Sequence, residues 1–338
     1  MRLLLLLLAA ALASARPSFT DYDALLHEKG VFVGTETRHG IEFAALNFSS
    51  IAASPHFLPA IAALAAPQNT SAFAHEDFLA YYINAYNLLA MKMVIEHPCR
   101  HDLFGQCAAV RGIREIGSLF HPVWNMPAGT MNNKTVTLQD VENTLRAPNH
   151  HGWPWSEDAR IHAAIVCMSI SCPNLRSEAY VSERVDAQLT DAMQKFLNNT
   201  AKGSLIHCDE SSQWIKLSSI FKWFMFDFAV NDSVVNAPLP YVANFVDARV
   251  RQCILAHESS FERSYFDYDW NLIGEGLQCS SRRACFGELD AVAVFSFVGI
   301  VCIAVGAFTC YCSYKRRNKR RHFVRLGDGD REALIQRK

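Results

Sequence analysis

One histidine and two cysteines lie close together in residues 160–180, RIHAAIVCMSISCPNLRSEAY. A cysteine and a histidine can perform acyl transfer, in which a thiolate attacks a carbonyl carbon and the histidine moves the proton. In this segment His162 would be the base and Cys172 the nucleophile. Because Pro173 suits the first position of a helix, a short helix over residues 173–180 is predicted. The free N–H groups at its start would favour the thiolate form of Cys172.

The elements expected around this segment favour Cys172 over Cys167 as the nucleophile. Residues 161–168 are a short apolar run typical of a buried strand. In a strand, His162 and Cys167 point to opposite faces because their positions have opposite parity. A catalytic histidine also needs a side chain that orients it. The candidates for that role are Asn84, Asn87 and Glu142.

The same residues also allow a structural interpretation. Cys167 and Cys172 are spaced to form a disulfide across a turn, and a disulfide has no nucleophilic thiolate. His162 would then be a buried ring that hydrogen-bonds to Glu142 or to an asparagine. The C-x2-C spacing of zinc sites is absent from this segment, and the chain has no phosphate-binding glycine loop. We therefore predict neither a metal nor a cofactor.

The two ends of the chain predict the compartment of this segment. Residues 1–15 have one arginine, a leucine-rich run and small residues at the end, which is typical of a secretory signal peptide. Residues 291–314 carry no charge and are long enough to cross a bilayer. Six cations follow directly within residues 315–321. This order predicts a single-pass type I membrane protein with residues 16–290 outside the cell or in a lumen.

The basic tail, residues 315–338, is explained by the membrane itself. The whole chain has a formal net charge of −1, so the cations are a local feature. Anionic lipid of the cytoplasmic leaflet is the expected partner of such a cluster, and no nucleic acid is expected. Cys310 and Cys312, at the cytoplasmic edge of the span, are candidate palmitoylation sites. The plasma membrane and the endomembrane system both fit this pattern.

The segment before the span is long enough for one globular domain with its own core. It contains sequons of the form N-x-[ST], which are acceptors of N-glycans in secreted proteins. These glycosylation candidates are Asn47, Asn69, Asn133, Asn198 and Asn231. The pattern predicts a glycoprotein that presents this domain to an unidentified extracellular or lumenal ligand.

An even number of cysteines in an oxidising compartment favours disulfides. Those of the predicted ectodomain are Cys99, Cys107, Cys167, Cys172, Cys208, Cys253, Cys279 and Cys285. Local spacing suggests the pairs Cys99–Cys107 and Cys279–Cys285, and Cys208–Cys253 would follow by elimination. Sequence alone does not choose among the 105 pairings that eight cysteines allow.

Hydrophobic periodicity predicts an α+β fold, mainly helical with a small sheet. A long helix is expected over residues 76–98, with Asn84 and Asn87 on one face. Asparagine is a poor residue for a helix interior, and the aromatic neighbours favour a buried hydrogen-bond network for this pair. The remaining predicted elements are a hairpin running into a helix with Thr137 as N-cap (123–146), a helix (181–199), a strand with a Ser-capped helix (214–228) and a helix (239–254).

These segments, in this order, resemble the family called domain of unknown function 547. The matching pieces are YYINAYNLL, TVTLQDVENTLR, RIHAAIVCMSISCPNLRSEAY, IKLSSIFKWFMFDF and FDYDWNLI. By this resemblance the family's motif positions are Asn84, Tyr86, Asn87, Glu142, Arg160, His162, Cys167, Ser171, Cys172 and Pro173. The family name implies no reaction.

The sequence thus predicts a membrane-anchored glycoprotein whose ectodomain has a binding or structural role. The alternative is a thiol-dependent hydrolase or acyltransferase of the peptidase or transglutaminase type. The expected parts are a signal peptide (1–15), an N-terminal part of the ectodomain (16–72), the family domain (73–275), a stalk (276–290), a transmembrane helix (291–314) and a cytoplasmic tail (315–338).

Overall fold

The structure is a computed structural model, and it describes residues 18–101, 107–118, 120–147, 158–209, 211–229 and 237–277. Several predicted features lie outside these residues and remain predictions. They are the signal peptide, the membrane span, the tail, most of the stalk, the sequon at Asn231, the pair Cys279–Cys285 and the palmitoylation candidates Cys310 and Cys312.

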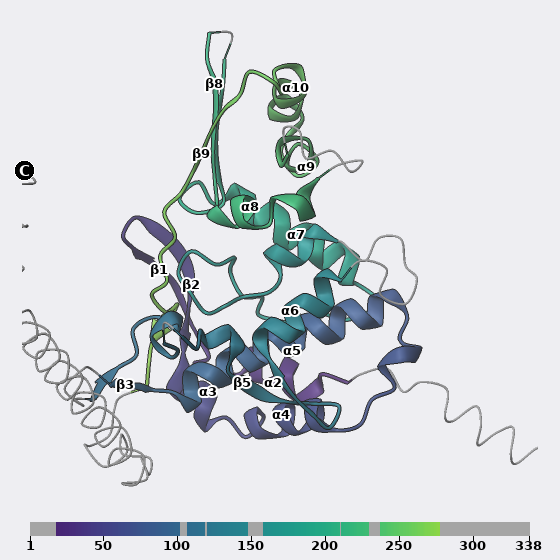
Figure 1. The fold of residues 1–338 in the computed structure, drawn as a ribbon, viewed down its shortest axis with the longest axis vertical. Helices are drawn as coiled ribbons and strands as arrows, with labels where there is room; N and C mark the ends of the chain where they lie inside the picture. The colour runs from purple at the N-terminus through teal and green to yellow at the C-terminus, as the bar shows by residue number, and fades with distance from the viewer. Residues whose placement is uncertain are drawn as a thin grey trace, which may run out of the picture. The chain divides into compact units, whose positions relative to one another are not determined.

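The long helix expected over residues 76–98 is α5, His75–Glu96, and Figure 1 shows it among the other helices of the fold. Its acidic residues Glu76 and Asp77 lie in the first turn, where they complement the helix dipole. Most of its side chains are buried, on every face. Within the described residues it is the one helix long and apolar enough to cross a membrane, but its burial is typical of a core helix.

The N-terminal segment packs into the same core as α5. Strands β1, Phe32–Arg38, and β2, Ile41–Asn47, form an antiparallel hairpin. Near the end of the described chain, β10, Gly274–Glu275, adds to β2 in parallel. A Cβ atom at Gly274 would lie 2.0 Å from the Leu46 carbonyl oxygen, so the pairing requires glycine there. The two ends of the domain are therefore held together by this sheet.

The predicted hairpin and helix over residues 123–146 are confirmed. Strands β5, Pro127–Met131, and β6, Lys134–Thr137, lead into α6, Leu138–Arg146. Thr137 caps α6 in a capping box with Asp140. Helix α6 packs against α5 and presents Glu142 and Arg146.

A second apolar cluster lies around α7, Val185–Asn198, as the pattern over residues 181–199 predicts. Strands β7, Ser204–Cys208, and β8, Gln213–Leu217, are antiparallel, and β9, Glu262–Tyr265, joins β8 in parallel. Ser218 caps the aromatic helix α8, Ser219–Trp223, as expected. A disulfide joins Cys208 on β7 to Cys253.

The other elements are short. They are α2 (Thr20–His27), α3 (Phe48–Ala53), α4 (Phe57–Ala65), η1 (Thr70–Ala72), β3 (Cys99–His101), β4 (Cys107–Ala109), η2 (Ile113–Glu115), η3 (Val123–Asn125), η5 (Ala159–Ala163), η6 (Met225–Phe228), α9 (Leu239–Val242) and α10 (Ala248–Ala256). Strands β3 and β4 pair and contain Cys99 and Cys107, but the Cys107 side chain lies outside the described set, so that disulfide stays a prediction. The mixed helices and small sheets confirm the α+β class.

Three predicted elements are wrong. The expected strand over residues 161–168 is instead η5 followed by irregular backbone, and the expected helix over 173–180 is absent. This apolar run is buried on all sides by neighbouring elements, so its composition does not reveal its backbone. The single helix expected over 239–254 is two, α9 and α10, because Asp247 caps a new helix start.

Candidate functional site

The loop that follows η5 is held by two asparagines of α5. The Asn84 amide donates to the Tyr180 carbonyl (2.8 Å) and accepts from the Tyr180 N–H (2.9 Å). The Asn87 amide donates to the Ala164 carbonyl (3.0 Å) and accepts from the Val166 N–H (2.7 Å). Both asparagines are buried, and they supply the backbone partners that a sheet would otherwise give. The buried network expected for this pair is present.

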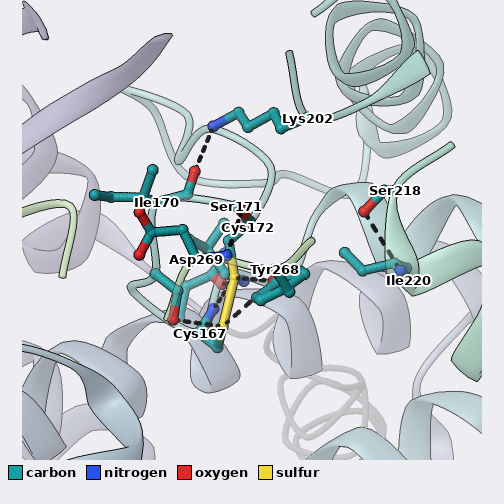
Figure 2. The surroundings of a disulfide bond; sticks show 12 residues. Cys167, Ile170, Ser171, Cys172, Lys202, Ser218, Ile220, Tyr268 and Asp269 are labelled. Atoms are coloured by element: carbon teal, nitrogen blue, oxygen red, sulfur yellow. Dashed lines mark hydrogen bonds between the residues drawn. A yellow bond between two sulfur atoms is a disulfide. The ribbon is translucent and has the colours of Figure 1, made fainter. Parts of the chain in front are cut away.

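Between the backbone groups bound by Asn87 and those bound by Asn84, a disulfide joins Cys167 to Cys172 (Figure 2). Both cysteines are buried, at 8% and 3% exposure. The Tyr268 hydroxyl donates to the Cys172 sulfur (3.1 Å), and the Cys167 N–H does the same (3.2 Å). A disulfide sulfur is neither a base nor a nucleophile in the way a thiolate is. In this state the segment therefore has no nucleophilic thiolate.

His162 hydrogen-bonds to an acidic residue that the sequence patterns did not single out. Its Nε2 lies 2.7 Å from Asp227 Oδ2, and its ring stacks on Phe224 with a centroid distance of 4.2 Å. Asp227 also accepts two hydrogen bonds from Arg146, at 2.6 Å from Nε and 3.1 Å from Nη2. The result is a compact group in which one carboxylate binds a guanidinium and an imidazole.

The protonation of this group follows from its burial. Burial lowers the pKa of His162 below its usual value, although the hydrogen bond to Asp227 opposes that shift. Burial alone would raise the pKa of Asp227, but the hydrogen bonds from His162 and Arg146 lower it to about 2. At neutral pH the imidazole is therefore neutral and donates from Nε2 to the carboxylate. Its Nδ1 is then an acceptor.

Glu142 is the second carboxyl group near this site. Its residue is 7% exposed, and its carboxyl oxygens are not among the fully buried polar atoms that lack a hydrogen-bond partner. Burial raises the pKa of Glu142 to about 7, with Arg146 lowering it and Asp227 raising it further. A carboxylic acid with this pKa is partly protonated at neutral pH, so it can both donate and accept a hydrogen bond.

Three of these side chains line one cleft of about 430 Å³, and Asp227 is not among the lining residues. Glu142, Arg146 and His162 lie along it with the disulfide Cys167–Cys172. The other lining residues are Tyr86, Trp124, Gln139, Ile165, Ile220, Trp223, Phe224, Tyr268 and Trp270. A mostly aromatic cleft with a few polar groups is the common form of a small-molecule site, for which roughly 300–1,000 Å³ is typical.

Residues 70–197 match the model of a family described as "Protein of unknown function, DUF547". The chain contains a DUF547 domain. The matched range of the DUF547 domain includes α5, α6, η5 and the disulfide loop, whereas Asp227 and Tyr268 lie beyond it. No curated protein and no solved structure matches the chain.

The residues that resemble the family's motif positions fall into two groups in the structure. Tyr86, Glu142, His162, Cys167 and Cys172 line the cleft. The others shape the surrounding backbone and are Asn84, Asn87, Arg160, Ser171 and Pro173.

Two of these backbone-shaping residues show how the loop is fixed. Arg160 binds Asp158 (2.6 Å) and Asp186 (2.8 Å), which ties η5 to α7. Ser171 accepts from the Asp269 N–H (2.8 Å), which ties the loop to the segment after β9. Sequence reasoning treated catalytic and shaping residues as one set, because a motif does not record which side chains face a cavity.

A wider hollow of about 780 Å³ lies between the β1–β2 hairpin and α7. It is lined by ion-paired residues such as Arg176 and Glu178 (2.7 Å), and none of the motif positions named above lines it. Buried Lys202 reaches from it to the Ile170 carbonyl (3.1 Å) and Asn174 (2.8 Å), as Figure 2 shows for Ile170. Through these two hydrogen bonds, the Lys202 ammonium group holds the loop that contains Ile170 and Asn174.

The described glycosylation candidates differ in accessibility. Asn69, Asn133 and Asn198 are exposed, with Asn133 in the β5–β6 turn at φ 60°. Asn47 is half-buried, and its side-chain oxygen accepts from the Ser50 N–H at the start of α3. Surface exposure is needed for a glycan, so the first three are the better acceptors.

Sequence reasoning missed Asp227, Arg146 and Tyr268 as members of the site. The signal that could have identified Asp227 is its position as the single charge between aromatic residues in WFMFDF. A buried charge is almost always paired, so that context predicts a cationic partner. Arg146 and Tyr268 lie in two of the pieces that resemble the family, TVTLQDVENTLR and FDYDWNLI, but nothing in those pieces indicates that either side chain faces a cavity.

Proposed function

We propose that this chain is a single-pass type I membrane glycoprotein whose DUF547 domain binds a small ligand in the aromatic cleft. The signal peptide pattern, the uncharged run at residues 291–314 and the cations after it support the topology. The plasma membrane and the endomembrane system are both consistent with it. Anionic lipid of the cytoplasmic leaflet is the partner proposed for the basic tail.

The observation that carries the binding role is the convergence of motif positions on one cavity. Three separate segments, α5, α6 and residues 159–172, each contribute a motif side chain to the cleft. Glu142 is 7% exposed and lines the cleft, and its carboxyl oxygens are not among the fully buried polar atoms that lack a partner. A ligand in the cleft could therefore hydrogen-bond to this carboxyl group.

A thiol-dependent hydrolase or acyltransferase is not supported by this geometry. That mechanism needs Cys172 as a thiolate, and Cys172 is joined to Cys167. The Nε2 atom of His162 hydrogen-bonds to Asp227, so it is not available to accept a proton from a nucleophile. The side-chain oxygen and nitrogen of Asn84 and of Asn87 are all hydrogen-bonded to backbone groups, so neither residue is available to orient a catalytic ring.

Thermal unfolding of the full chain in detergent tests the binding role. Four classes of probe at high concentration are neutral sugars, organic acids, amines and nucleosides. We expect one class to raise the melting temperature by several degrees, because a ligand at 100 times its Kd stabilises by about 2.7 kcal/mol. The shift should persist in Trp214→Ala, whose ring stacks on His207 outside the cleft, and fall to about half in Trp223→Ala. An equal shift in both variants, or none with any class, contradicts a binding cleft.

Glycan mapping tests the topology. Expression in cells with a secretory pathway should give a protein whose mass falls on endoglycosidase treatment. The single substitutions Asn69→Gln, Asn133→Gln and Asn198→Gln should each remove one glycan, because these side chains are exposed. A sugar-free ectodomain that is digested by protease added on the cytosolic side contradicts the proposed orientation.

A further inference from the structure

The carboxyl group of Glu142 limits which chemical groups a ligand in the cleft can present. Glu142 is 7% exposed and lines the cavity, and no described residue hydrogen-bonds to it. Its carboxyl oxygens are not among the fully buried polar atoms that lack a partner, so a molecule in the cleft can hydrogen-bond to them. The ligand should therefore present hydrogen-bonding groups toward α6, where Gln139 also lines the cleft.

The charges in the cleft favour a ligand without charge. Arg146 and Asp227 neutralise each other, and His162 is neutral when it donates to Asp227. A cation entering the cleft would meet Arg146, whose guanidinium carbon lies 4.6 Å above the Phe224 ring. An anion would meet the carboxyl group of Glu142, which lines the cleft. Both kinds of ion are therefore disfavoured relative to a neutral molecule.

The aromatic wall of the cleft offers flat faces. Trp223 stacks on Trp270 with a centroid distance of 5.6 Å and an interplanar angle of 17°. Tyr268 and Trp124 contact the same Trp270, at 4.3 Å and 5.4 Å. Trp223 remains 47% exposed, so a ligand can reach it. A ring with an apolar C–H face and hydroxyl groups at its edge could stack on this wall. Its hydroxyl groups could at the same time hydrogen-bond to the polar side chains of the cleft.

We infer that the cleft binds an uncharged, hydroxylated ring, namely a neutral sugar unit of a glycan. Trp223 is the stacking surface, and the hydroxyl groups bind Glu142, Gln139 and the Nδ1 atom of His162. This inference rests on the proposed binding function and names its ligand class.

The geometry favours binding of the sugar over its hydrolysis. Cleavage of a glycosidic bond normally uses two carboxyl groups, one as acid and one as base or nucleophile. Both oxygens of Asp227 accept hydrogen bonds from Arg146, and one of them also accepts from His162. Glu142 has no second free carboxylate beside it in the cleft lining of the described residues.

A glycan array probed with the full chain in detergent, followed by titration of the retained oligosaccharides, tests this inference. We expect neutral oligosaccharides to be retained. Trp223→Ala should weaken their binding about tenfold, as should Glu142→Ala, because each removes one stacking or hydrogen-bond partner. Glu142→Gln keeps a donor and an acceptor and should stay within about threefold of wild type. Trp214→Ala is the matched control and should bind as wild type does.

Two results would overturn the inference. One is retention of charged probes alone, such as amines or sialylated and sulfated glycans, with loss in Trp223→Ala. That outcome keeps a binding cleft but rejects the neutral sugar. The other is that no glycan is retained, in which case thermal unfolding with the remaining probe classes decides whether the cleft binds a different ligand or none.

Discussion

Replacing Asn87 with alanine is expected to lower the free energy of unfolding by about 4 kcal/mol. The substitution removes both hydrogen bonds of the amide and leaves the Val166 N–H and the Ala164 carbonyl without partners. Both of these residues are buried, so water cannot replace the lost partners without opening the core. Each orphaned backbone group costs about 1–3 kcal/mol, and the vacated volume adds to that.

Thermal unfolding of the full chain measures this effect. A loss of about 4 kcal/mol corresponds to a decrease in melting temperature on the order of 10 °C for a domain of this size. Asn143→Ala is the matched control, because Asn143 is exposed on α6 and, among the described residues, its side chain hydrogen-bonds to Gln139 alone (2.9 Å). The control should change the stability by less than about 0.5 kcal/mol. Equal, small effects of the two substitutions would show that Asn87 does not hold the disulfide loop.

Replacing Glu142 with glutamine is expected to stabilise the protein at pH 8 and to have little effect at pH 5. Burial raises the pKa of Glu142 from an ordinary value near 4.5 to about 7, so the folded state holds its proton more tightly than the unfolded state does. A group of this kind contributes stability that is complete below pH 4.5 and is lost as the pH rises through 7. A shift of this size corresponds to about 3 kcal/mol at pH 8.

The difference in unfolding free energy between Glu142→Gln and wild type isolates this contribution across pH 4 to 8. His162 and Asp227 titrate in both proteins, so their effects cancel in the difference as long as the variant keeps their contacts. Glu115→Gln, at a half-exposed ion pair with Arg100 (3.2 Å), is a control that should not show the same slope. A flat difference across this pH range would show that water reaches Glu142 and that the cleft is not a low-dielectric site.

The helices that carry the site could be predicted because their signals are local. Thr137 with Asp140 forms a capping box, and Ser218 begins α8, and both signals depend on a few neighbouring residues. The backbone of residues 159–180 could not be predicted, because it is shaped by distant partners. Asn84 and Asn87 lie about 80 to 100 residues away from the groups they bind, and an apolar composition does not record such contacts.

The cleft itself was only partly predictable from the sequence. His162, Cys172 and Glu142 were identified as chemically capable residues, and the structure brings them to one cavity. The partner of His162 is Asp227, 65 residues further along the chain, and the sequence suggested Glu142 or an asparagine instead. Pairing of a buried histidine depends on the tertiary packing of η6 against η5, which no periodicity in either segment specifies.

Alkylation of the native full chain before and after reduction tests the central claim that the segment around Cys172 is a closed structural loop. The account predicts that Cys167 and Cys172 take up no label near neutral pH, even in denaturant, until a reductant opens their disulfide. Peptide masses would then show both cysteines labelled together. Rapid labelling of Cys172 in the native, unreduced protein would contradict the account and restore the thiol as a candidate nucleophile.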